Sequence, residues 1–248
     1  MIRRLTVPLA ESWSAAPRTP PGAPAGPPRA IRVLAVSDEV EAGLWEHLDR
    51  RALGRIDLLV SCGDLPPDYL SYLEGSLRVP LVLVTGNHDL DDAWRHEAAR
   101  LLPARGPGAD LVEAAGLGIV SLDWPGTGKA RTRSQDLTAW RQVLGLALRV
   151  ALGGRRPVVV ASHVAPHAAG DARDVYHRGF RAYRWLAERL RPALWLHGHT
   201  TPASVPERIT HIGPTTCVNV TGAYLVDLVP PGVQPGADAD GGDRNPAG

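Results

Sequence analysis

Cysteine is scarce in this chain of 248 residues, which has only Cys62 and Cys217, both in apolar runs that resemble strands. Two cysteines are too few for a zinc finger, so that class of metal-stabilised domain is excluded. Cysteines in apolar strands are more typical of buried free thiols than of a disulfide. We therefore expect a protein of a reducing compartment.

Long hydrophobic runs are missing as well. No apolar stretch approaches the ~20 residues that an α-helix needs to cross a bilayer. The N-terminal segment MIRRLTVPLAESW contains two arginines, but Pro8 and Glu11 interrupt its apolar part, so it makes a poor signal peptide. We expect a cytoplasmic protein without membrane association.

Charge of one sign is not in excess either. The 27 lysine and arginine residues against 26 aspartate and glutamate residues give a net charge of +1. This balance offers no electrostatic reason to expect nucleic acid or an anionic membrane as a partner. Lys129 is the only lysine. Arg131 and Arg133 lie in the same loop and could hold phosphate, although a solvated arginine is the default.

Hydrophobic residues make up 44% of the chain, which is enough for the core of one domain. Proline, alanine, glycine and serine dominate residues 14–30, and the last segment has a similar composition. Such segments bury little surface. We therefore predict a disordered tail over 1–30, one folded domain over 31–229 and a second disordered tail over 230–248. The sequence gives no indication of an oligomeric state.

Short apolar runs alternate with helical patterns in the first part of this domain. The runs at 31–36, 56–61 and 81–84 are rich in β-branched residues, which is typical of buried strands. Helical spacing of apolar residues follows each of them, over 41–52, after Pro66-Pro67 and over about 91–102, which predicts a parallel sheet with crossover helices. The second part predicts further strands at 117–122, 157–161, 193–196, 203–212, 215–220 and 223–228, with helices at 135–152 and 179–190.

Polar side chains follow five of these strands: Asp38, Asp64, Asn87, His163 and His199. Because strand ends converge at one edge of a sheet, we expect these groups to share one site. Carboxylate, amide and imidazole ligands suit manganese, iron or zinc better than a thiolate site does. Taken singly, each aspartate could instead cap a helix and each histidine could be a hydrogen-bonded loop residue.

The order of the segments VSDE, SCGDL, TGNHD, ASH and LHGHT resembles the calcineurin-like metallophosphoesterases. That family has the blocks D-x-H, G-D, G-N-H-D/E, a lone H and G-H-x-H in this order. The likeness is greatest to small prokaryotic members with a D-E first block, which also carry an H-R-G-F segment like residues 177–180. The resemblance covers residues 31 to about 228. It implies an α/β fold of four layers (αββα), in which helices flank two mixed sheets.

The resemblance also implies a centre for two divalent metals. Asp64 would bridge them, and Asn87, His163 and His199 would complete one site, while Asp38 would serve the other. The metal would be manganese, with iron or zinc as alternatives.

The activity that the resemblance implies is hydrolysis of a phosphomonoester or phosphodiester by a metal-activated water. The protein would thus be a phosphatase or phosphodiesterase for a small phosphorylated substrate. His88 would be the general acid for the leaving oxygen, and Asp89 would orient it.

The sequence departs from the family pattern at two ligands of the second metal. Val40 and Thr201 stand where the family usually has histidines. We therefore expect one firm metal site and a doubtful second one. Replacement ligands or substrate contacts could come from Glu39, His197 or His177. His197 lies two residues before His199 on an extended stretch and could face the same way, but it could equally be a buried structural residue.

The same departures favour an alternative function. A degenerate member of the fold would bind metal and a phosphorylated ligand without efficient turnover. A zinc deaminase or metalloprotease is excluded, because the sequence has neither HExxH nor a cysteine-based zinc motif.

Overall fold

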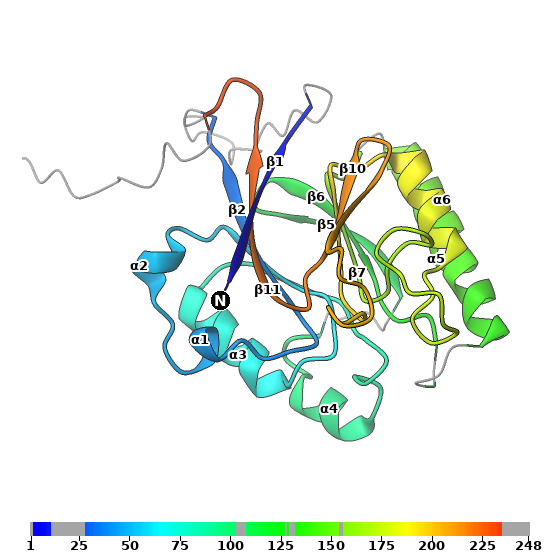
Figure 1. The fold of residues 1–248 in the computed structure, drawn as a ribbon, viewed down its shortest axis with the longest axis horizontal. Helices are drawn as coiled ribbons and strands as arrows, with labels where there is room; N and C mark the ends of the chain where they lie inside the picture. The colour runs from blue at the N-terminus through cyan, green and yellow to red at the C-terminus, as the bar shows by residue number, and fades with distance from the viewer. Residues whose placement is uncertain are drawn as a thin grey trace, which may run out of the picture.

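The computed structural model describes residues 2–10, 28–102, 108–126, 128, 132–153 and 156–234. These residues form two mixed sheets that pack face to face, with helices on the outer side of each (Figure 1). This arrangement is the predicted α/β sandwich with flanking helices.

The first sheet has the strand order β1-β11-β2-β3-β4. Its strands are β1 (Arg3–Pro8), β2 (Ile31–Ser37), β3 (Leu58–Ser61), β4 (Leu81–Leu83) and β11 (Gly222–Val229). As predicted, β2, β3 and β4 run parallel, whereas β11 pairs with β2 in the antiparallel direction. The helices along this half of the chain are α1 (Ala42–Trp45), α2 (Arg50–Leu53), α3 (Pro67–Leu77) and α4 (Asp92–Glu97).

The second sheet has the strand order β5-β6-β7-β8-β10-β9. Its strands are β5 (Ala109–Ala114), β6 (Leu117–Leu122), β7 (Val159–Ser162), β8 (Leu194–His197), β9 (Ile209–Ile212) and β10 (Thr215–Asn219). The helices α5 (Arg133–Gly153) and α6 (Arg181–Leu190) cover its outer face (Figure 1). Within the described ranges, no helix combines the length and apolarity that crossing a bilayer requires.

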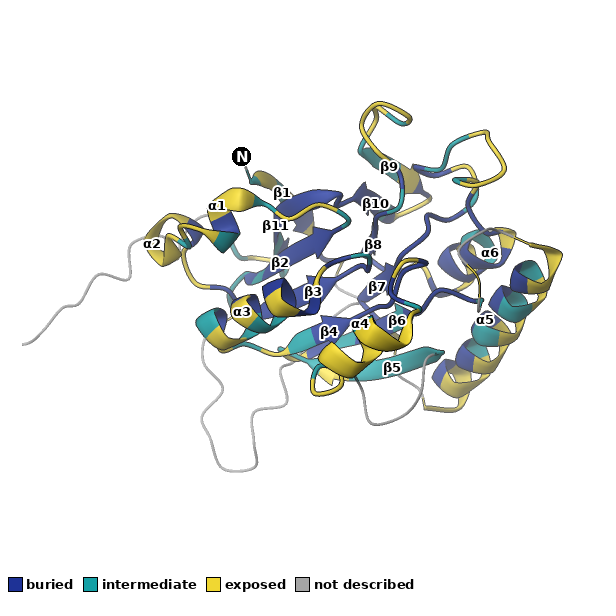
Figure 2. Cartoon of the chain, turned by 90° about the horizontal axis from the view of Figure 1, so that it is seen from below, coloured by how far each residue is buried: buried dark blue, intermediate teal, exposed yellow. Residues whose placement is uncertain are grey.

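The main core lies between the sheets. Val33 and Val60 of the first sheet belong to the same buried cluster as Ile119 and Leu196 of the second. Both faces of the central strands are covered, which explains why these segments are continuous apolar runs in the sequence. Figure 2 shows the strands as largely buried and the outer faces of the helices as exposed. Both cysteines are free and buried, in agreement with the sequence prediction.

The predicted N-terminal tail is wrong for the first part of its range. Arg3–Pro8 forms β1, which pairs in parallel with β11, and Val7 and Leu9 enter the core between the sheets. The segment is short and rich in charge, and its partner strand lies at the other end of the chain, so no local pattern reveals it. Residues 11–27 and 235–248 of the two predicted tails lie outside the described residues.

Other differences concern element boundaries. The helix predicted over 41–52 is two short helices, because the Asp49 carboxylate accepts the N–H groups of Arg51 and Ala52 and starts α2. The strand β5 was not predicted, since it is a half-buried edge strand without a strong apolar pattern. The helix predicted over 91–102 ends at Glu97, and only Ile209–Ile212 of the strand predicted over 203–212 is extended.

Replacing Val7 with alanine tests whether β1 belongs to the core. Val7 is buried, whereas the adjacent Thr6 is exposed. We expect Val7→Ala to lower the free energy of unfolding by about 1–3 kcal/mol, because two buried methyl groups are lost and a cavity remains. Urea denaturation measures this change. The control Thr6→Ala should change it by less than about 0.5 kcal/mol. Equal effects of the two variants would contradict the packing of β1 described here.

Candidate metal centre

The polar groups that follow β2, β3, β4, β7 and β8 meet at one end of the sandwich. They form an open cleft of about 610 Å³, lined by Asp38, Asp64, Asn87, His88, Tyr176, His177 and His199. His163 lies buried beneath it. The structure thus gathers the predicted ligands in one place, as expected from the convergence of strand ends.

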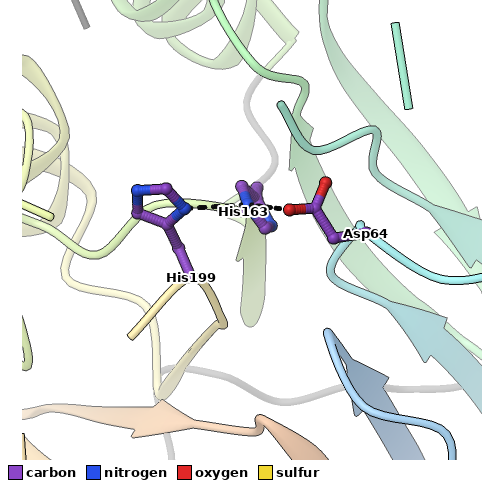
Figure 3. Close-up of side chains that lie close together, drawn as sticks. All are labelled: Asp64, His163 and His199. Carbon is purple, nitrogen blue, oxygen red and sulfur yellow. Dashed lines mark hydrogen bonds and ion pairs between the residues drawn. The ribbon is translucent and has the colours of Figure 1, made fainter. Parts of the chain in front are cut away.

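Asp64, His163 and His199 form the most compact group in this cleft. Their candidate ligand atoms all lie within 4.8 Å of one another. Nε2 of His163 is 3.1 Å from Oδ2 of Asp64 and 3.1 Å from Nδ1 of His199. Figure 3 shows the His163 ring between the other two side chains. A carboxylate oxygen and two imidazole nitrogens are a donor set that divalent first-row metals bind.

Backbone carbonyls orient both imidazoles toward this centre. Nδ1–H of His163 donates to the Cys62 carbonyl oxygen at 2.8 Å, and Nε2–H of His199 donates to the Tyr176 carbonyl oxygen at 3.0 Å. Each bond uses the nitrogen that points away, so the other nitrogen of each ring is the one that faces the centre. Oδ1 of Asn87 lies 2.9 Å from the same His163 Nε2 and supplies a fourth donor atom.

The electrostatic environment of Asp64 and His163 also favours a bound cation. Burial opposes a charge on His163, but the adjacent Asp64 carboxylate overcomes it and raises the pKa of the imidazole to about 9. Burial likewise opposes ionisation of Asp64, yet His163 keeps the pKa of this carboxyl below its usual range. The site therefore holds positive charge beside a buried carboxylate. A metal cation would replace that proton.

Asp38 lies in the same cleft but outside the compact group. Both of its carboxylate oxygens accept the backbone N–H of His199, at 3.0 and 3.1 Å, and Oδ2 also accepts the Thr221 hydroxyl at 3.3 Å. Among the described residues that line the cleft, neither Val40 nor Thr201 occurs. The second predicted site therefore has fewer donors than the first.

Of the three replacement candidates, only His177 lines the cleft. Its Nδ1 lies 3.0 Å from the Asp174 carboxylate, and its ring centroid is 5.2 Å from that of His199. Glu39 is exposed and acts electrostatically on Arg208, outside the cleft.

Of the two interpretations of His197, the structure favours a buried structural residue over a substrate contact or replacement ligand. The side chain is completely buried, close to Gly170, and it does not line the cleft. Burial lowers its pKa to about 4, so the ring is neutral. The strand alternation from His199 gave the wrong direction, because His199 itself has a positive φ of 68° and leaves the strand geometry.

His88 and Asp89 differ in where their side chains lie. His88 is exposed and lines the cleft, where a substrate could reach it. Asp89 is buried, and its Oδ2 accepts the backbone N–H groups of Gly86 and Asp64, both at 2.8 Å. Within the described residues it has no hydrogen bond to His88. Asp89 therefore does not orient that ring and instead joins the loops after β3 and β4.

Unusual backbone geometry is concentrated at this site. Asp38, Asp64 and His199 have φ values of 61°, 58° and 68°, which cost roughly 1–3 kcal/mol each for residues other than glycine. A Cβ atom at Gly86 would overlap the Asp64 carboxylate, and one at Gly198 would overlap that of Asp38. Strain and close packing thus hold the carboxylates in place, which explains the glycines of the GNHD and GHT segments.

Sequence reasoning missed Tyr176 and Trp124. Tyr176 contributes a backbone carbonyl, which no residue-type pattern can reveal. The Trp124 ring lies beside the imidazoles, with centroid distances of 6.3 Å to His163 and 5.8 Å to His199. Trp124 lies two residues after β6, near the same strand ends as the other residues, but the search for polar groups did not select an indole.

Replacing Asp89 with alanine tests its structural role. We expect Asp89→Ala to weaken manganese binding by about 10–100-fold, because the loops that carry Asp64 and Asn87 lose their shared acceptor. Titration against a competing chelator measures this affinity. The control His88→Ala should leave it within about twofold, since that ring is not among the expected ligands. If Asp89→Ala kept full affinity and lost only turnover, Asp89 would act on His88 after all.

Comparison with known proteins places these features in a family. A search of curated proteins finds no match. One solved structure has a TM-score of 0.54 at 14% identity, over 80% of this chain and 95% of its own. Two structures of Vps29 each have a TM-score of 0.39. The one from Cryptosporidium parvum is 13% identical, over 78% of this chain and 75% of its own. The zinc complex from Entamoeba histolytica is 14% identical, over 77% of this chain and 74% of its own. At 14% identity and a TM-score of 0.54, the first likeness shows the fold alone. The two Vps29 structures, with TM-scores of 0.39, are more distant.

The model of the calcineurin-like phosphoesterases matches residues 31–202, from β2 to just beyond the GHT segment. This range includes every predicted metal ligand and well over half of the chain. The chain therefore belongs to the calcineurin-like phosphoesterase family.

Proposed function

We propose that this protein is a metal-dependent hydrolase of phosphoric esters, a phosphatase or phosphodiesterase acting on a small phosphorylated substrate. The observation that carries this proposal is the compact group of Asp64, His163 and His199 in an open cleft. We further propose a cytoplasmic location, which the free buried cysteines support.

The residues of the site fit a divalent metal. Backbone carbonyls fix the orientation of both imidazoles so that one nitrogen of each ring faces the centre, and Asn87 adds an amide oxygen. These four residues would hold one cation, with manganese proposed first and iron or zinc as alternatives. When bound, the cation would lower the pKa of a coordinated water and offset the charge of the phosphoryl group. Asp38 would serve a second, weaker site.

The chain's own groups would position the ester and supply a proton. Oδ1 of Asp64 accepts the backbone N–H of His88 at 2.8 Å. This hydrogen bond holds the carboxylate next to the residue that we propose as the general acid. The His88 side chain is free to approach the leaving oxygen from the open cleft. We assign it the role of general acid.

A second candidate function is binding of a phosphorylated ligand without efficient turnover. The observation in its favour is the environment of Asp38, whose oxygens already accept hydrogen bonds from His199 and Thr221. A cation there would have to share these acceptors. Hydrolysis of p-nitrophenyl phosphate and of bis(p-nitrophenyl) phosphate with added manganese separates the two functions, because only a phosphatase or phosphodiesterase releases nitrophenol from one of them.

The Asp64→Asn variant tests the metal site directly. We expect about one tightly held metal per chain after dialysis of the unaltered protein, and its loss in the variant with at least about a 100-fold fall in hydrolysis, because the central carboxylate charge is removed. Elemental analysis and the nitrophenol assay give the two values. Asp68→Asn, at an exposed position in α3, is the matched control. Normal metal content and turnover in Asp64→Asn would overturn the assignment.

His88→Ala tests the general acid. Esters with a poor leaving group should lose about 100-fold or more in rate, because their departing oxygen needs a proton. Esters with an acidic leaving group should lose much less. The difference is measured by comparing the hydrolysis rates of an alkyl phosphate and the corresponding nitrophenyl phosphate. Equal losses for both would mean that His88 does not donate a proton.

A further inference from the structure

One loop, residues 171–180, borders two separate hollows. Tyr176 and His177 line the metal cleft, whereas Val175, Arg178 and Gly179 line a second hollow of about 560 Å³. The first turns of α5 and the start of α6 form most of the remaining wall of this second hollow. These other lining residues are Thr132, Arg133, Asp136, Trp140, His167 and Arg181.

Positive charge is concentrated in this second hollow, although the whole chain is close to neutral. Three guanidinium groups, those of Arg133, Arg178 and Arg181, line it together with one carboxylate, that of Asp136. Arg178 donates to the backbone carbonyl of Arg173 at 3.2 Å. Within the described part of the chain, the guanidinium groups of Arg133 and Arg181 make no hydrogen bond or ion pair. Their donor groups remain available for an anion.

The loop between the two hollows is held in place by Asp171. Its Oδ2 accepts the backbone N–H of Gly179 at 2.9 Å and lies 3.2 Å from Nδ1 of His167. A Cβ atom at Gly179 would overlap the carbonyl groups of Ala165 and Pro166, so the loop passes very close to that segment. This wall of the hollow is therefore fixed before any ligand arrives, which reduces the entropic cost of binding.

We propose that the second hollow, named here the arginine hollow, is an anion-binding site that takes a phosphate group distinct from the one at the metal centre. Guanidinium groups bind phosphate oxygens in a bidentate manner, and the indole of Trp140 adds an apolar wall. The phosphate belongs either to a separate anion or to the far end of a substrate with two phosphate groups. Only the second assignment rests on the proposed hydrolase function.

Binding of inorganic pyrophosphate to the full chain in excess chelator tests the site without any need for metal or turnover. We expect calorimetry at low salt to detect binding, with each of Arg133→Gln and Arg181→Gln weakening it by about 10-fold, because each removes a charged phosphate contact. Arg141→Gln on α5 and Arg189→Gln on α6 are exposed controls outside the hollow and should change it by less than about twofold. Absence of binding, or equal losses in all four variants, would overturn the proposal.

Kinetics with manganese then shows which molecule carries the phosphate. If the substrate carries it, Arg181→Gln raises KM for fructose 1,6-bisphosphate, which has a phosphate ester at each end, by about 10-fold and leaves KM for p-nitrophenyl phosphate unchanged. If a separate anion carries it, both KM values stay unchanged while the calorimetric loss remains. Both results support the arginine hollow. A variant that binds pyrophosphate normally but loses turnover with both esters would refute it and place Arg181 in the metal cleft.

Discussion

The contact between Asp64 and His163 joins the two sheets of the sandwich. Asp64 follows β3 in the first sheet, and His163 follows β7 in the second, yet their side chains lie 3.1 Å apart. His199, after β8, and Asn87, after β4, meet at the same His163 nitrogen. The candidate centre is thus composed of residues from both sheets. A cation bound there would hold the sheets together at this end, just as the apolar core does between them.

This junction depends on local backbone distortion. The carboxylates reach the centre because Asp38 and Asp64 adopt left-handed conformations and because glycine leaves room at Gly86 and Gly198. Asp89 then joins the Asp64 loop to the Gly86 loop through two backbone bonds. Substitutions that relieve the strain would stabilise the chain and displace the ligands, a conflict that is common at functional sites.

Much of the fold could be predicted from the sequence because its strands are buried on both faces. Short apolar runs such as those of β2 and β3 are typical of buried strands, and the polar groups after them converge because these strands pair in parallel. β1 could not be predicted, because its partner β11 is remote and its own pattern is short. At the site, residue types indicated which side chains gather in the cleft, but the direction of His197 and the partners of Asp89 depend on φ angles and backbone contacts that the sequence does not display.

The position of β11 has a consequence for the order in which the chain can fold. This strand lies between β1 and β2, and the residue before it, Thr221, donates to the Asp38 carboxylate. During synthesis, β1 has no partner strand and β2 can pair only with β3 until residues 222–229 have left the ribosome. The first sheet therefore keeps an unpaired edge of β2, beside the residues of the candidate metal centre, until β11 is added. Such an open edge in a nascent chain can pair with other chains, which favours aggregation.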